Sequence, residues 1–352
     1  MNIEALYQIY SSNYLVTTDT RAIKKDAVFF SLQGEHFNGN KFAAIAIEKG
    51  AKYAVIDDVN YQIQGKTILV NNVLQTLQKL ANYHRKQLKI PIIGITGSNG
   101  KTTTKELIHA VLATQFKTKA TKGNLNNHIG VPLTLLSFTN KTEIGIVEMG
   151  ANHQKEIEFL SSICEPDVGY ITNFGKAHLE GFGGIEGVIK GKSELYTYLK
   201  KNNKLAFIDA TDAKQLELTK EIEKIPLDTS ITISSTQPLL ALNYNNEIID
   251  TQLIGAYNLN NIKAAIAIGE YYKISKKNII TGIRNYKPNK NRSQVVKKNS
   301  NTIVMDAYNA NPSSTRLALE NFNEINHEHK IVILGDMFEL GTASEKEHQN
   351  IV

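Results

Sequence analysis

A glycine-rich segment, Ile92–Thr104 (IIGITGSNGKTTT), combines the residue types that bind phosphate groups. An aliphatic run leads into a short loop, and a helix-like stretch follows. In such loops, backbone N–H groups and the helix N-terminus hold phosphates, the lysine offsets their charge, and the next hydroxyl binds Mg²⁺. The spacing is GxxGKT, which is shorter than the common GxxxxGK[ST], and a plain Gly/Asn turn is the alternative that the strand–loop–helix context disfavours. The candidate nucleotide-binding residues are Gly97, Ser98, Asn99, Gly100, Lys101, Thr102 and Thr103.

Two further polar residues follow strand-like runs. Glu148 ends the apolar run that starts at Ile144, and His178 follows the run Val168–Thr172. An acid at the carboxyl edge of a sheet that also carries a phosphate loop is well placed to bind Mg²⁺. Without the loop, an exposed carboxylate would be an equally good interpretation of Glu148. A lone histidine more often makes only a hydrogen bond, so the residues alone assign no role to His178.

A segment rich in asparagine, Thr121–Leu133 (TKGNLNNHIGVPL), stands before an apolar run. Clustered amide side chains both donate to and accept from a polar substrate. A capped loop that precedes a helix explains the same pattern, and composition alone favours that simpler interpretation.

The central part of the chain alternates between strand-like and helix-like segments, which predicts an α/β fold. Such alternation indicates a mostly parallel sheet with helices on both faces, and such sheets bind ligands at the carboxyl ends of their strands. The expected strands are Ile90–Thr96, Ile144–Glu148, Val168–Thr172 and Leu205–Ile208. The expected helices are Thr103–Ala113, Lys155–Ile163, Gly187–Leu199 and Asn260–Tyr272.

Smaller α/β units are expected on both sides of this region. The first has strands at Ala27–Leu32 and Tyr53–Ile56, a helix within Phe42–Lys49, and a helix at Val73–Leu88 that leads out of it. The last has strands at Thr302–Asp306 and Ile331–Gly335, a helix at Ser313–Asn323, and a helix from Ser344. Because two parallel strands do not supply a self-sufficient core, we expect this last unit to be incomplete and easily opened.

Composition narrows the class of protein. The chain has 352 residues, 41% of them hydrophobic, a net charge of +6 and a single cysteine, Cys164. This length suggests two or three domains, and one cysteine excludes an internal disulfide framework. The lysine-rich clusters Lys200–Lys204 and Lys287–Arg292 lack the interleaved aromatic residues of a nucleic-acid groove. No run is long enough for a membrane span and the N-terminus shows no secretory pattern, so we expect a cytoplasmic protein.

Together these segments resemble the Mur ligases over the whole chain. The narrowest resemblance is to the branch that adds D-alanyl-D-alanine, because a DNPR-type motif of the diaminopimelate-adding branch is absent. Folylpolyglutamate synthases share the phosphate loop but lack the NANP segment. The segments that carry the resemblance are Thr121–Leu136, Glu148–Asn152, Asn173–Phe182, Gly255–Asn261, Asp306–Pro312 and Leu334–Gly341.

The resemblance implies a three-domain architecture around a central parallel-sheet P-loop ATPase. Residues 1–88 would bind the UDP-sugar, residues 89–294 would bind ATP, and residues 295–352 would form a truncated, Rossmann-like ligase domain. In that family the third domain closes over ATP, so activity of this chain would depend on how much of that domain is needed.

The resemblance also implies roles for individual residues. Lys101 would contact the phosphates, Thr102 and Glu148 would hold a first Mg²⁺, and His178 would hold a second. Lys192 aligns with a carbamoylated lysine that would assist at the second ion. Further ATP-binding positions would be Asn258 and Asn261 near the adenine, Arg292 near the phosphates and Asp306 near the ribose. In the acyl substrate, the UDP group would contact Thr20, Arg21, Ser31 and Gly34, and the muramoyl-peptide would contact Thr121, Asn124, Asn126 and Asn127.

The implied activity is an ATP-dependent ligase that joins D-alanyl-D-alanine to UDP-N-acetylmuramoyl-tripeptide through an acyl phosphate. We expect ATP, two Mg²⁺ ions, the two small-molecule substrates and a monomer, with no nucleic acid and no membrane span. Two alternatives stay open, a related ligase that adds another amino acid and a nucleotide-binding protein without turnover. Tyr257 and Asn38 stand where many relatives have His and Asp, and we expect these differences to adjust function.

Overall fold

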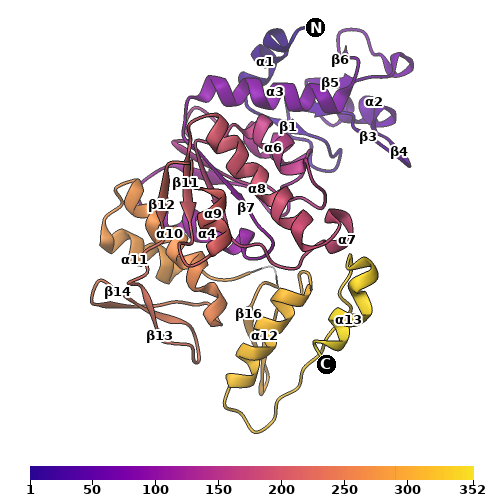
Figure 1. The fold of residues 1–352 in the computed structure, drawn as a ribbon. Helices are drawn as coiled ribbons and strands as arrows, with labels where there is room; N and C mark the ends of the chain where they lie inside the picture. Colours follow the sequence, from indigo (N-terminus) through magenta and orange to yellow (C-terminus); the bar gives the residue numbers. More distant parts are fainter. Residues whose placement is uncertain (290) are drawn as a thin grey trace.

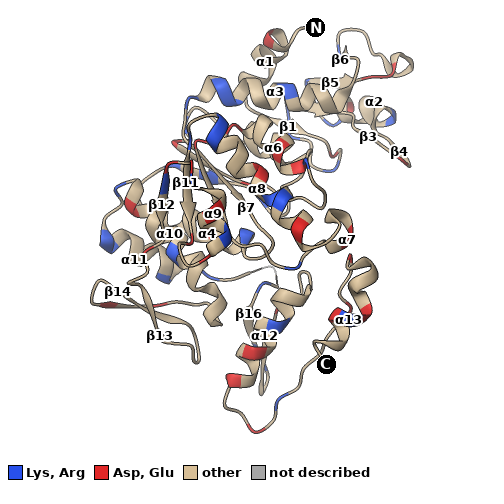
Figure 2. Cartoon of the chain, viewed as in Figure 1, with Lys and Arg blue, Asp and Glu red and all other residues tan. Residues whose placement is uncertain are grey.

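The computed structural model describes residues 1–289 and 291–352. Lys290, which belongs to the lysine-rich stretch noted above, lies outside the described residues. Three groups of elements follow one another along the chain, from the N-terminal unit through a large central unit to a C-terminal region (Figure 1). Basic and acidic residues are interspersed over all three groups, as Figure 2 shows, rather than gathered into one basic face. Within the described residues, no helix combines the length and the apolar character that a membrane crossing requires.

The N-terminal unit is built on a four-stranded parallel sheet of order β1-β2-β5-β6. Its strands are β1 Val16–Thr17, β2 Val28–Phe30, β5 Tyr53–Ile56 and β6 Thr67–Leu69, with a short hairpin of β3 Gln33–Gly34 and β4 Phe37–Asn38. Its helices are α1 Ile3–Ser11, η1 Gly39–Phe42, α2 Ala43–Glu48, η2 Val59–Tyr61 and α3 Val73–Leu88.

Helix α3 joins this unit to the next. Asn72 caps its first turn, because its side chain accepts a hydrogen bond from the Gln75 amide at 2.8 Å. The helix then packs against α1 on one side and α5 Gly130–Leu136 and α6 Glu156–Cys164 on the other. Buried His84 and Arg85 reach from α3 to carbonyl groups of the central unit.

The central unit is a six-stranded sheet of order β12-β11-β10-β7-β9-β8 in which all neighbours are parallel. Its strands are β7 Ile92–Thr96, β8 Thr118–Ala120, β9 Ile144–Glu148, β10 Val168–Ile171, β11 Leu205–Ile208 and β12 Lys224–Pro226. The strands β7, β9, β10 and β11 are buried along their whole lengths, as expected for a parallel sheet that is covered on both faces.

Two separate apolar cores lie on the two faces of this sheet. Ile93 and Ile95 of β7 pack with α4 Lys101–Leu112, α10 Leu259–Tyr271 and α11 Lys276–Asn285. Ile92, whose side chain points the other way, packs with α3, α5, α6 and α8 Ile185–Lys201. The smaller elements of this unit are α7 Leu179–Phe182, α9 Ala213–Leu218, η3 Ala256–Asn258 and the antiparallel sheet β13 Thr232–Ser235, β14 Ala241–Tyr244 and β15 Glu247–Asp250.

The C-terminal region consists of an antiparallel hairpin, β16 Gln294–Lys298 with β17 Asn301–Met305, followed by α12 Pro312–Glu324, η4 Gly341–Ala343 and α13 Ser344–Gln349. The prediction of a strand at Ile331–Gly335 is wrong, because this segment forms no strand. Ile331 is 82% and Ile333 91% exposed, so these side chains lack the apolar cover that would stabilise a strand.

The other predicted elements agree with the structure to within about three residues at each end. The phosphate-loop helix α4 begins at Lys101 rather than Thr103, so the lysine and both hydroxyl residues stand in its first turn. The sequence did not predict helices α1, α9 and α11, the short strands β1, β3, β4, β6, β8 and β12, the three-stranded antiparallel sheet β13–β15 or the hairpin partner β16. Strands of two to five residues with mixed exposure carry too little periodic pattern to be recognised.

Candidate active site

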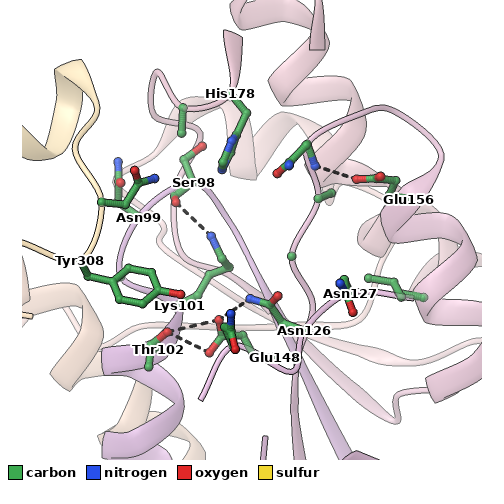
Figure 3. A pocket seen from close by; sticks show the side chains of 18 of the residues that line it. Ser98, Asn99, Lys101, Thr102, Asn126, Asn127, Glu148, Glu156, His178 and Tyr308 are labelled. Atoms are coloured by element: carbon green, nitrogen blue, oxygen red, sulfur yellow. Dashed lines mark hydrogen bonds between the residues drawn. The ribbon is translucent and has the colours of Figure 1, made fainter. Parts of the chain in front are cut away.

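A cavity of about 1140 Å³ opens at the carboxyl ends of the central strands. It is bounded by the phosphate loop after β7, by Glu148 at the end of β9, and by the segment that follows β10. Helix α3 contributes Gln75 and Gln78 at one side, and the C-terminal region contributes Tyr308 at another. Figure 3 shows the side chains of Lys101, Thr102, Glu148, Asn126 and His178 around this single space.

The phosphate loop turns sharply and is anchored to the strand beside it. Gly97 has φ +137°, and a Cβ there would lie 2.0 Å from the Thr172 hydroxyl, so only glycine fits. The amide of Ser98 donates to the Asn173 carbonyl at 3.0 Å. Lys101 folds back over the loop, where its Nζ donates to the carbonyl oxygens of Gly97 at 2.7 Å and Ser98 at 3.0 Å. Burial lowers the pKa of Lys101, and Glu148 opposes that decrease.

Glu148 is almost fully buried, and its carboxylate is held by side chains from two different segments. The Thr102 hydroxyl donates to it at 3.0 Å, and Nδ2 of Asn126 donates at 2.9 Å. The predicted Mg²⁺ ligands Thr102 and Glu148 are therefore in contact, and the asparagine-rich segment reaches the same carboxylate. Thr121 lies behind this point, because its buried hydroxyl accepts from the Glu148 amide at 2.9 Å rather than lining the cavity.

His178 lines the cavity, and Lys192 lies behind its wall. Nδ1 of His178 hydrogen-bonds to the carboxylate of Glu339, and burial lowers the pKa of this imidazole although Glu339 opposes the decrease. Lys192 is fully buried in α8, where its Nζ donates to the Ala151 carbonyl at 2.8 Å and lies 4.8 Å from the centre of the Phe182 ring. Burial lowers the pKa of Lys192 well below its ordinary value, and the positive charge of Lys101 acts in the same direction.

The cavity lining also includes Asn258, Asn261 and Asp306, which are expected near the nucleoside, and Arg292, which is expected near the phosphates. Asn261 is oriented by two side chains, since its Oδ1 accepts from Thr104 at 2.9 Å and its Nδ2 donates to Asn258 at 2.8 Å. The Arg292 guanidinium stacks on the Tyr308 ring at 3.7 Å, and its buried Nε has no hydrogen-bond partner among the described residues. Burial raises the pKa of Asp306, which accepts from the Ser293 amide at 3.3 Å.

The structure does not bring every predicted residue to this cavity. Gly97 and Thr121 lie just outside its lining, and Thr20, Arg21, Ser31 and Gly34 belong to the N-terminal unit. The last four lie after β1 and β2, where the carboxyl ends of parallel strands share one edge. There Arg21 is exposed and paired with Asp19, while the buried Ser31 hydroxyl has no partner within the described part of the chain.

Several residues at the site were not singled out from the sequence. Asn311 and Tyr308 reach the cavity from the segment before α12, although both belong to the Asp306–Pro312 motif that carries the family resemblance. Glu339 contacts His178 and lies within the Leu334–Gly341 segment that carries the family resemblance, whereas Lys105 contacts Glu148 and no local pattern marks it. Among residues 1–289 and 291–352, no group of three His, Cys, Asp or Glu side chains is arranged to hold a metal ion.

Models of one family match nearly the whole chain. A Mur ligase family catalytic domain matches residues 13–94, a Mur ligase middle domain matches residues 95–269, and a Mur ligase glutamate ligase domain matches residues 291–352. These three matches correspond in order to the N-terminal unit, the central unit and the C-terminal region of the structure.

Curated relatives and solved structures agree with these matches. The UDP-N-acetylmuramoyl-tripeptide–D-alanyl-D-alanine ligase of Bacillus subtilis is 35% identical over 95% of this chain and 76% of its own length, and that of Escherichia coli is 32% identical over 96% and 77%. A crystal structure of MurF from Acinetobacter baumannii matches with a TM-score of 0.84 at 30% identity, over 96% of this chain and 76% of that one. MurF ligase from Thermotoga maritima in complex with ADP matches with a TM-score of 0.81 at 26% identity, over 96% and 81%. This chain, with its three-part α/β architecture and its phosphate loop, belongs to the Mur ligase family.

Proposed function

We propose that this protein is an ATP-dependent ligase that joins D-alanyl-D-alanine to UDP-N-acetylmuramoyl-tripeptide in peptidoglycan precursor synthesis. The observation that carries the proposal is the contact of Thr102 and Asn126 with one buried carboxylate, that of Glu148. Through it the phosphate loop and the asparagine-rich segment converge on a single point, as a reaction between ATP and an acyl substrate requires. The names of the relatives from Bacillus subtilis and Escherichia coli support the choice of substrates.

The chemistry begins with a carboxylate, which is a poor electrophile. The terminal carboxylate oxygen of the tripeptide attacks the γ-phosphorus of ATP, the bond to the bridging oxygen breaks, and ADP leaves. The product is an acyl phosphate. The amine of D-alanyl-D-alanine then attacks its carbonyl carbon, phosphate leaves, and the amine loses a proton to complete the amide. Such catalysis consists mainly of positioning and charge stabilisation.

Residues of this chain would supply both the charge stabilisation and the positioning of the substrates. Lys101, already pointing along the loop, would offset the charge on the transferred phosphoryl group. Arg292 lines the same cavity and presents a buried Nε without a partner among the described residues, which suits it to the phosphates of ATP. Asn124, Asn126 and Asn127 would hold the muramoyl-peptide, and Asn258, Asn261 and Asp306 would bind the nucleoside.

The donor set fits Mg²⁺ of the kind that phosphates help to hold. This ion usually binds through one or two carboxylates together with substrate phosphates and water, and the Glu148 carboxylate beside the Thr102 hydroxyl supplies such a partial set. Thr102 and Glu148 would hold one ion. His178 would hold a second, since its lowered pKa favours the neutral imidazole that binds metals. When bound, the ions would offset negative charge on the transferred group.

Lys192 suits the carbamate that the family resemblance implies. A neutral amine reacts with CO₂ to give a carbamate and one proton, and burial favours the neutral amine here. The carbamate would add an anionic oxygen behind the cavity wall at Ala151, where a bare ammonium would repel a metal ion. We therefore propose that Lys192 is carbamoylated in the active enzyme.

We propose three domains with the boundaries expected from the sequence, residues 1–88, 89–294 and 295–352. We also propose that the protein acts as a monomer, as expected from the family resemblance. The cytoplasm is the proposed location, since ATP is the expected co-substrate.

The decisive experiment measures phosphate release with UDP-N-acetylmuramoyl-tripeptide, ATP and D-alanyl-D-alanine. Borohydride reduction during turnover should trap the acyl phosphate as the corresponding alcohol. Parallel reactions with single amino acids in place of the dipeptide test for a related ligase with a different acceptor. Nucleotide binding without phosphate release under every condition would contradict the proposal and identify a binding protein without turnover.

A further inference from the structure

Lys105 is a fully buried lysine one helical turn beyond Lys101 on α4. Its side chain is 0% exposed, and its Nζ donates to the Thr121 carbonyl at 2.6 Å. The same Nζ lies 3.1 Å from Oε1 of Glu106 and 3.6 Å from Oε2 of Glu148. Glu148 is itself only 2% exposed at its side chain, so the two form a buried pair of opposite charges.

A buried ammonium group of this kind is costly and calls for an explanation. Moving an ion from water into a protein interior costs on the order of several kcal/mol, and a buried ion pair is often no more stabilising than a well-packed apolar pair. A leucine or methionine would cover the same part of α4 without that cost. The contacts of Lys105 therefore indicate a role beyond packing.

Those contacts connect three parts of the site. Lys105 stands on the helix that opens at the phosphate loop, and it touches Glu148 at the end of β9. It also fixes the carbonyl of Thr121, whose hydroxyl accepts from the Glu148 amide at 2.9 Å. Thr121 begins the asparagine-rich segment, which returns to the same carboxylate through Asn126.

The carboxylate of Glu148 is thus held on two sides. The Thr102 hydroxyl and the Asn126 amide contact it from the cavity, and Lys105 faces Oε2 from the interior. An ion entering from the cavity would replace contacts on the first side only. The interior contact would remain and would keep the carboxylate pointing outward.

We propose that Lys105 is a positioning residue that holds Glu148 in the orientation required for Mg²⁺ and ties it to the start of the asparagine-rich segment. This inference rests on the proposed role of Glu148 as a magnesium ligand. Lys105 acts through Glu148 and Thr121 and contacts no substrate itself.

The test measures the affinity for ADP by calorimetry, with Mg²⁺ present and with Mg²⁺ removed by a chelator. The variant Lys105→Met keeps the length of the side chain and removes its charge. We expect its ADP affinity without Mg²⁺ to match that of the original protein, and the gain on adding Mg²⁺ to fall about tenfold or more, as for other residues that orient metal ligands. Glu106→Gln is the matched control, since it alters a neighbour of Lys105 that does not touch Glu148, and its effect should stay below about threefold.

Each result has a defined meaning. If the ADP affinity of the original protein does not depend on Mg²⁺, the proposed function itself is contradicted. If Mg²⁺ raises the ADP affinity of the original protein and of Lys105→Met by the same factor, only the role of Lys105 is overturned. If Lys105→Met fails to fold, the double variant Lys105→Met/Glu148→Gln decides: recovered folding shows that Lys105 serves the charge of Glu148, and continued misfolding assigns Lys105 to packing alone.

Discussion

The side-chain amides of Asn99 and Asn311 face each other across 212 positions of sequence. Nδ2 of Asn311 donates to Oδ1 of Asn99 at 2.6 Å, and Nδ2 of Asn99 lies 3.4 Å from Oδ1 of Asn311. Asn99 belongs to the phosphate loop, and Asn311 caps the first turn of α12. Nearby, the amide of Lys176 donates to the Ser313 hydroxyl at 2.9 Å. The C-terminal region therefore rests directly on the loop that is proposed to bind ATP.

Asn311→Ser should weaken this link without unfolding α12. Serine also caps helices but is too short to reach Asn99, so one neutral hydrogen bond is lost. We expect phosphate release at limiting ATP to fall roughly 2–10-fold, which corresponds to about 1 kcal/mol. Ser314→Ala is the control, because it disturbs the capping box and spares the contact with Asn99. Equal losses of activity in both variants would show that capping, not the contact with the loop, is responsible.

Lys101→Ala should abolish turnover and leave the fold intact. Its Nζ contacts only loop carbonyl groups in the described structure, so the side chain is available to phosphates and contributes little to the core. We expect a decrease of at least about 100-fold in acyl transfer, with a nearly unchanged thermal midpoint. Lys117→Ala is the control, because Lys117 is an exposed lysine outside the phosphate loop and its loss should leave acyl transfer unchanged. A folded Lys101→Ala variant with normal activity would remove the lysine from the mechanism.

Lys192→Ala should lose most activity, and bicarbonate with a short carboxylate such as formate should restore part of it. The added anion would occupy the space of the proposed carbamate. Lys190→Ala, an exposed lysine on the same helix, should behave like the original protein. Intact-mass measurement under CO₂ adds a second readout, since the carbamate increases the mass at this lysine. Normal turnover of Lys192→Ala in bicarbonate-free buffer would exclude the carbamate.

Stability should fall with acidity because of His84. This buried imidazole projects from α3 and hydrogen-bonds to the Phe138 carbonyl, and burial lowers its pKa to about 4. As the pH falls, the histidine of the unfolded chain takes up a proton near pH 6.5, whereas that of the folded chain does so only near pH 4. The contribution of neutral His84 to the unfolding free energy is therefore complete above about pH 6.5 and decreases until about pH 4. We expect a loss of about 2 kcal/mol in unfolding free energy from this residue between about pH 7 and pH 5. Urea unfolding of His84→Gln should lack that component, and an identical pH dependence in the variant would refute the assignment.

Hydrogen exchange should be much faster in residues 298–352 than in the central sheet. The only sheet in this part of the described chain is a two-stranded hairpin, and the segment around Ile333 is exposed and unpaired. Local opening requires little apolar surface to be uncovered there. Amides of β7 and β10, buried on both faces, should exchange only on global unfolding. Equal protection in the two regions would show that the C-terminal region is stable by itself.

Much of the fold and the main parts of the site follow from local sequence patterns. Buried parallel strands are continuous apolar runs, so β7, β9, β10 and β11 could be predicted with small errors at their ends. The phosphate loop is likewise a local motif, because its backbone conformation depends on nearby glycines such as Gly97. Glu148 and His178 could be placed at one edge of the sheet, since the carboxyl ends of parallel strands meet there.

The sequence could not show which side chains meet once the strands are ordered. Lys105 has the same local pattern as any lysine on an amphipathic helix, and its burial depends on Thr121 and Glu148 arriving from other segments. The pairing of Asn99 with Asn311 depends in the same way on how α12 packs against the loop. The Ile331–Gly335 segment shows the converse, because its apolar pattern is that of a strand and no neighbouring strand pairs with it in the structure. Short-range periodicity thus determined the buried central strands and the phosphate loop, whereas long-range packing, on which burial and pairing depend, decided which further residues complete the site.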